Sequence, residues 1–85
     1  MREEFILYGT LGCHLCELAE ALIEAECLQR PEAFSITLAD IADQDDLMSR
    51  YGTRIPVLRR KDTDEELNWP FDREILRLFL DPLGN

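Results

Sequence analysis

Residues 8–22 read YGTLGCHLCELAEAL, and this stretch joins the features that decide the fold. An apolar run, Phe5–Tyr8, leads into it and is typical of a strand buried on both faces. Cys13 and Cys16 follow, with two residues between them, and from Leu15 apolar residues recur at helical spacing. The pair is therefore expected at the junction of a strand and a helix. It could bind a metal, form a structural bridge or exchange electrons.

The expected position of the cysteine pair favours redox chemistry. At the start of a helix the backbone N–H groups are unpaired and the macrodipole is positive, so a thiolate is stabilised there. We predict that Cys13 is the nucleophile, with a pKa below the free value of about 8.5. Cys16 lies one turn further on and can resolve a mixed disulfide. His14 is expected to tune the pair through its partial positive charge, and Gly12 gives the approach loop room to turn.

A metal site is the main alternative for the cysteine pair. Structural zinc usually takes four ligands, and the nearby candidates are only His14 and Cys27. His14 lies between the two cysteines, and Cys27 lies about 16 Å further along the helix at 1.5 Å per residue. We therefore predict no metal, and we expect Cys27 to be a small, buried or half-buried apolar residue rather than a third redox partner.

The rest of the chain alternates between strand and helix patterns. Strands are expected at residues 5–8, 34–39, 57–59 and 66–69, and helices at 15–28, 47–51 and 75–80. A polar turn at residues 61–64 suggests a hairpin between the last two strands. The order β-α-β-α-β-β-α predicts an α/β fold, a mixed four-stranded sheet flanked by helices, in which the first two strands are parallel.

Several residues are expected to mark the faces and ends of these helices. The apolar face of the first helix is predicted to comprise Leu15, Leu18, Ala19, Leu22 and Ile23. Asp43 resembles a cap for the second helix, which Gly52 would end. Asp72 is expected to cap the last helix, and Pro82 and Gly84 to stop it.

Composition and charge narrow the classes of function. The chain has 85 residues, enough for one small domain, 1–85, and 46% of them are hydrophobic. With 18 acidic against 9 basic residues the net charge is −9, which disfavours nucleic acid and anionic membranes as partners. The sequence shows neither a signal peptide nor a membrane span, and three cysteines are an odd number. We expect a cytoplasmic monomer whose thiols are kept reduced.

A second motif gives the cysteine pair a family resemblance. Thr53-Arg54-Ile55-Pro56-Val57-Leu58 resembles the Thr-x-x-Pro-x-Leu stretch that precedes the third strand of glutaredoxins. Together with the Cys-x-x-Cys after the first strand, it makes the chain resemble the small bacterial glutaredoxin-like proteins of the thioredoxin fold. The resemblance implies that Pro56 is cis and lies beside the cysteines. It also implies that Thr53, Arg54, Ile55 and Pro56 shape the substrate site, where the Ile55 backbone would pair with a bound peptide.

Three departures from that family concern glutathione. Glutaredoxins that use glutathione usually carry a basic residue just before the pair, where this chain has Leu11 and Gly12. They usually have Gly-Gly before the last helix, where this chain has Trp69-Pro70-Phe71 followed by Asp72. His14-Leu15 also replaces the usual Pro-Tyr between the cysteines. We therefore expect glutathione to be at most a weak co-substrate, and no cofactor is required by the chemistry.

The sequence thus predicts a dithiol–disulfide oxidoreductase of glutaredoxin-like type. Its partners would be protein disulfide substrates and a thiol reductant system. A non-catalytic binding module with the same fold is the first alternative, because the fold alone does not fix activity. An iron–sulfur or zinc carrier is the second.

Overall fold

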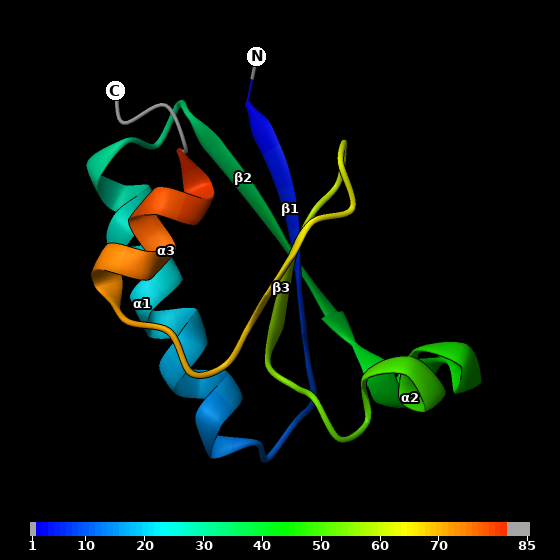
Figure 1. Ribbon diagram of the computed structural model, residues 1–85. Helices are drawn as coiled ribbons and strands as arrows, with labels where there is room; N and C mark the ends of the chain where they lie inside the picture. The colour runs from blue at the N-terminus through cyan, green and yellow to red at the C-terminus, as the bar shows by residue number, and fades with distance from the viewer. Residues whose placement is uncertain (1, 82–85) are drawn as a thin grey trace.

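The computed structural model describes residues 2–81 of the chain, which form one sheet with helices on both faces (Figure 1). The elements, in chain order, are β1 (Glu3–Gly9), α1 (His14–Gln29), β2 (Phe34–Asp40), a 3-10 turn (Ile41–Asp43), α2 (Asp45–Tyr51), β3 (Val57–Arg60), β4 (Glu66–Asn68) and α3 (Arg73–Leu80). The predicted β-α-β-α-β-β-α order is confirmed, and the fold is the expected mixed α/β arrangement.

The sheet has the strand order β2-β1-β3-β4. β1 and β2 are parallel, as predicted for strands joined through a helix, whereas β1 pairs with β3 and β3 with β4 in antiparallel fashion. β3 and β4 form the expected hairpin across residues 61–64. β1 is thus an inner strand with a paired neighbour along each edge, and the cysteine loop leaves from its carboxyl end.

Two apolar clusters follow from the alternation of side chains along β1. Phe5 and Leu7 point to the face that α1 and α3 cover, and the main core forms there. Tyr8 points to the opposite face, where a smaller cluster with Tyr51 attaches α2. Figure 1 shows α1 and α3 together on one side of the sheet and α2 on the other.

The buried face of α1 differs from the predicted one. Its buried residues are Cys16, Ala19, Ile23 and Glu26. Leu15 and Leu18 are instead 46% and 43% exposed, because the helix buries one narrow stripe against the sheet and these two leucines lie to the side of it. The expectation that Leu15 and Leu18 belong to the core is therefore wrong.

The predicted cap of α2 is also wrong. Asp43 lies in the 3-10 turn, and Gln44 occupies the N-cap position without a side-chain hydrogen bond. Asp40, the last residue of β2, caps the turn by accepting a hydrogen bond from the Ala42 N–H at 2.9 Å. The chain starts to turn directly after the strand, so the acid that comes first takes the capping position.

The remaining predicted helix ends are confirmed where the structure describes them. Gly52 is the C-cap of α2, and a Cβ there would come within 2.5 Å of the Met48 carbonyl oxygen. Asp72 caps α3 by accepting a hydrogen bond from the Ile75 N–H at 2.8 Å. Pro82 and Gly84, predicted to stop this helix, lie outside the described residues.

Candidate redox site

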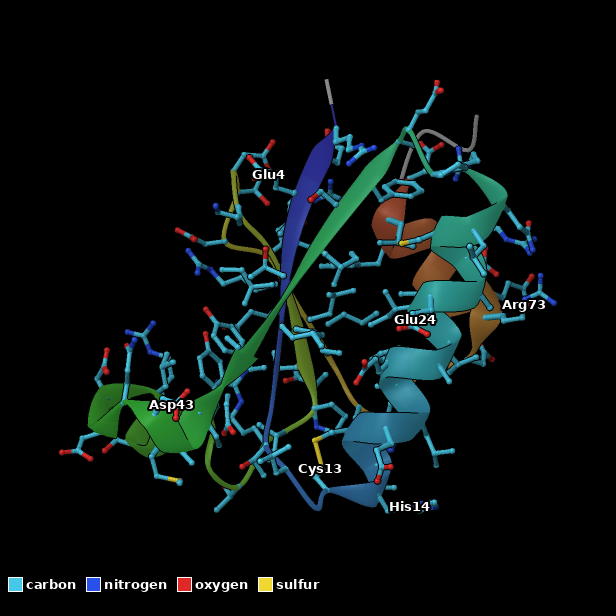
Figure 2. The ribbon with its side chains drawn as sticks, turned by 180° about the vertical axis from the view of Figure 1, so that it is seen from behind. Glu4, Cys13, His14, Glu24, Asp43 and Arg73 are labelled. Carbon is cyan, nitrogen blue, oxygen red and sulfur yellow. A yellow bond between two sulfur atoms is a disulfide. The ribbon has the colours of Figure 1, made fainter. Side chains whose placement is uncertain are left out.

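Cys13 and Cys16 lie where the sequence predicted them, at the first turn of α1 (Figure 2). Cys13 is the N-cap residue, and its sulfur accepts a hydrogen bond from the Cys16 N–H at 3.1 Å. The two sulfur atoms are bonded as a disulfide with a Cα–Cα distance of 5.2 Å. Cys16 is buried and Cys13 is partly exposed, so an incoming group reaches Cys13 first.

Two glycines shape the loop that holds the pair. Gly12 has φ = 77°, a left-handed conformation that glycine adopts without a steric penalty. Gly9 ends β1, and a Cβ at this position would lie 3.1 Å from the Cys16 sulfur. Gly12 therefore turns the chain into the helix, and Gly9 makes room for the buried sulfur.

The register of the sheet places Pro56 beside this site. Tyr8 of β1 is paired with Val57 of β3, so the next residues on the two antiparallel strands, Gly9 and Pro56, adjoin each other. Pro56 is buried, and the Ile55–Pro56 peptide bond is cis, as the family resemblance implied. A second cis bond, Trp69–Pro70, was not predicted. The loops before β3 and after β1 meet at one end of the sheet (Figure 1).

The segment before Pro56 is held by Tyr51. The Tyr51 carbonyl oxygen accepts hydrogen bonds from the N–H groups of Arg54 and Ile55, at 2.8 and 3.1 Å. Thr53 is exposed on the same turn. The Ile55 N–H is therefore taken up within this turn.

Glu66 of β4 binds the Arg54 side chain. An Arg54 guanidinium nitrogen lies 2.6 Å from one Glu66 oxygen and 3.1 Å from the Asn68 side-chain oxygen. The buried Tyr51 hydroxyl donates to the other Glu66 oxygen at 2.6 Å. The pKa of Glu66 is lowered, mainly by the hydrogen bond from Tyr51 and to a smaller extent by the one from Arg54. The pKa of Tyr51 is raised, mainly by burial and to a smaller extent by its hydrogen bond to Glu66. Arg54 thus carries a charge that is already paired.

Two further residues from the sequence analysis are His14 and Cys27. His14 is the first residue of α1 and is exposed, and Figure 2 shows its side chain pointing away from the sheet. Cys27 is a half-buried free thiol, whose pKa is raised by burial and by the nearby Glu26 and Glu24 carboxylates. Within residues 2–81, no group of three or more His, Cys, Asp or Glu side chains is placed to hold a metal ion.

Sequence reasoning missed Gly9, Tyr51 and Glu66 as parts of the site. Gly9 carried a signal, since a glycine at the end of a buried strand often marks a close approach of other atoms. Tyr51 was expected only as the last residue of a short helix, and Glu66 only as the first residue of a strand. Their hydrogen bond joins residues 15 positions apart, and no local pattern encodes it.

Comparison with known proteins agrees with this geometry. The family described as Glutaredoxin-like domain (DUF836) matches residues 4–81. The crystal structure of protein XcR50 from X. campestris is similar, with 37% sequence identity, a TM-score of 0.75, and coverage of 92% of this chain and 96% of that one. Its solution structure gives 42% identity, a TM-score of 0.69 and 92% coverage of both chains. No curated protein matches the chain.

A third similar structure comes from another organism. The solution structure of protein Ne2328 from Nitrosomonas europaea is 30% identical, with a TM-score of 0.69, and the match covers 93% of this chain and 92% of that one. The fold and the Cys-x-x-Cys at the first helix define a thioredoxin-fold protein. More narrowly, the chain belongs to the glutaredoxin-like family that the match to residues 4–81 identifies.

Proposed function

We propose that this protein is a dithiol–disulfide oxidoreductase that acts on protein disulfides. The observation that carries the proposal is the position of Cys13 as N-cap of α1, where its sulfur already accepts the Cys16 N–H. In the reduced protein the same N–H group and the positive end of the helix would stabilise a Cys13 thiolate. The buried Cys16 would stay a thiol until a mixed disulfide forms next to it.

The proposed reaction is a pair of thiol–disulfide exchanges. The Cys13 thiolate attacks one sulfur of a substrate disulfide, forms a mixed disulfide and releases the other substrate sulfur as a thiolate. Cys16 then loses its proton, attacks the Cys13 sulfur and releases the second substrate thiolate. The substrate gains two electrons, and Cys13 and Cys16 end as the disulfide seen in the structure. An external thiol reductant returns the pair to the dithiol.

Residues 53–56 are the proposed substrate edge. Pro56 adjoins Gly9, and a Cβ at Gly9 would lie 3.1 Å from the Cys16 sulfur, so a strand added along Ile55 would run past the cysteine pair. Glutathione would serve poorly at this edge, because Arg54 is bound by Glu66 and Asp72 caps α3. We also propose that the protein works in the cytoplasm; the described residues contain no helix suited to crossing a membrane.

An insulin-disulfide reduction assay with a regenerating reductant tests the proposal. We expect turnover with the wild-type chain and with Cys27→Ser, and none with Cys13→Ser. Cys16→Ser should accumulate mixed disulfides at Cys13, and their identification by mass spectrometry would name the substrates. Failure of the wild-type chain to reduce any disulfide or to form a mixed disulfide would instead favour a non-catalytic binding module.

A further inference from the structure

A groove runs between α1 and β2, on the face of the sheet that α1 covers only in part. It consists of two adjoining hollows of about 290 and 150 Å³ that share Leu7, Glu20 and Leu38. Its floor is apolar, with Leu7 and Ile23 buried, and Leu38 on β2 is 57% exposed. One end of the groove reaches Leu11 and Cys16, next to the redox site.

The outer edge of β2 borders this groove and is unprotected. β2 is the end strand of the sheet, and all seven of its residues pair with β1 on the inner side. No other strand in residues 2–81 covers its outer side. Edge strands are usually guarded by lysine, proline or a bulge, but the strand reads FSITLAD, and its only charge is Asp40 at the end. Unpaired backbone groups and an apolar groove therefore lie side by side.

The charges around the groove all have one sign. The ionised side chains that line it are Glu20, Glu24 and Asp40, and no lysine or arginine is among its lining residues. Figure 2 shows Glu24 on the side of α1 that faces β2. The chain as a whole has a net charge of −9, so the field at the groove favours a cationic occupant.

We propose that this groove binds an extended, basic segment of a partner protein, which adds to β2 as a fifth strand. The face of that segment toward α1 would carry apolar side chains for the floor and lysine or arginine for Glu20 and Glu24. A second copy of this chain fits poorly, because antiparallel pairing of two β2 edges would bring the acidic rims together and supply no cation. The surface is separate from residues 53–56, so a partner bound here leaves the proposed substrate edge open.

A peptide titration followed by NMR tests the proposal with the wild-type protein in its disulfide form. The probe is a synthetic, cysteine-free Leu-Thr-Lys-Thr repeat, which cannot take part in thiol exchange. We expect its binding to shift the amide signals of β2, of Leu11 and of the first three turns of α1. A repeat of Leu-Thr-Glu-Thr, which carries the opposite charge, should not bind. A Leu-Thr-Lys-Thr repeat in which every backbone nitrogen is methylated, and which therefore has no backbone N–H groups, should not bind either.

Charge variants locate the binding site. Glu20→Gln combined with Glu24→Gln should weaken the affinity for the lysine repeat about fivefold, the effect of losing two exposed charge contacts. Asp62→Asn combined with Glu74→Gln removes the same charge from exposed positions outside the groove and should leave the affinity unchanged. Added salt should weaken binding of the lysine repeat.

Four results would overturn the proposal. They are no binding of the lysine repeat, equal binding of the glutamate repeat, signal shifts centred on residues 53–56, and a concentration-dependent dimer that forms through β2. None of them bears on disulfide reduction, since the probe contains no thiol and the insulin assay contains no such peptide.

Discussion

Glu26 on α1 and Arg73 on α3 form an ion pair in which the acid is buried and the base is exposed. The Arg73 Nε donates to a Glu26 oxygen at 2.9 Å, and the Arg77 Nε lies 3.4 Å from the other oxygen. The Glu26 side chain is 5% exposed, whereas those of the two arginines are about half exposed. Two solvated cations therefore close over one buried carboxylate and join the helices that cover the main core. Figure 2 shows Arg73 beside α1.

Glu26→Gln should lower the free energy of unfolding by about 1–2 kcal/mol at neutral pH. This is the contribution of a charged hydrogen bond that is weakened by solvent screening. The Arg73 hydrogen bond, against the opposing effect of burial, lowers the pKa of Glu26 in the folded protein. The stabilisation is therefore present above the unfolded pKa of about 4.3 and lost as the pH falls through the lower folded value. Urea unfolding at a series of pH values measures this difference. Glu24→Gln is the control on an exposed position of α1, and an equal effect there would contradict the prediction.

The rate at which Cys13 of the reduced protein reacts with iodoacetamide should rise with pH, and the midpoint of this rise should lie below about pH 8.5, because Cys13 caps α1. Cys27 supplies an internal control, since burial and the neighbouring Glu26 and Glu24 raise its pKa and should keep it slow. Mass spectrometry of the alkylated peptides separates the two sites. A Cys13 midpoint at or above about 8.5 would show that the helix start does not activate this thiol.

Gly12→Ala should destabilise the protein by about 1 kcal/mol, because φ = 77° forces an alanine into the left-handed region. A Cβ at this position would meet no other atom within 4 Å, so the cost is that of the backbone alone. Gly12→Asn should cost less, since asparagine tolerates this conformation. Urea unfolding of the oxidised forms tests whether stability falls from the wild type through the asparagine variant to the alanine variant. Equal stability of the alanine variant and the wild type would mean that the loop adopts another conformation in solution.

The parts of this site that the sequence predicted are local, and the parts it missed are not. Gly12, Cys13 and Cys16 lie close together in the sequence, so the change from a strand pattern to a helix pattern was enough to place them. The hydrogen bond between Tyr51 and Glu66 depends on how α2 packs against the β3–β4 hairpin, and neither segment reveals it alone. The exposure of Leu15 and Leu18 was missed for a related reason. Helical spacing shows that a face is apolar but does not show how much of it the sheet covers.

Glutathione turnover is expected to be low in this protein and to rise when Arg54 is released from Glu66. Binding an anionic tripeptide takes a free cation near the cysteine pair and open N–H groups at the last helix. Arg54 is the nearest replacement for the missing basic residue, but Glu66 and Asn68 hold its guanidinium at 2.6 and 3.1 Å. The Asp72 side chain takes the Ile75 N–H at the start of α3 and adds a like charge there.

Glu66→Gln removes the charge that pairs with Arg54 but keeps an oxygen that can accept the Tyr51 hydrogen bond. We expect this variant to raise the rate in a glutathione-coupled assay about tenfold, as one charge-assisted contact becomes available to the substrate. Adding Arg54→Ala to Glu66→Gln should cancel the gain, and Glu65→Gln, on an exposed neighbour, should not reproduce it. A wild-type rate comparable to that of an ordinary dithiol glutaredoxin, or a gain that survives the loss of Arg54, would show that the glutathione carboxylates are bound elsewhere.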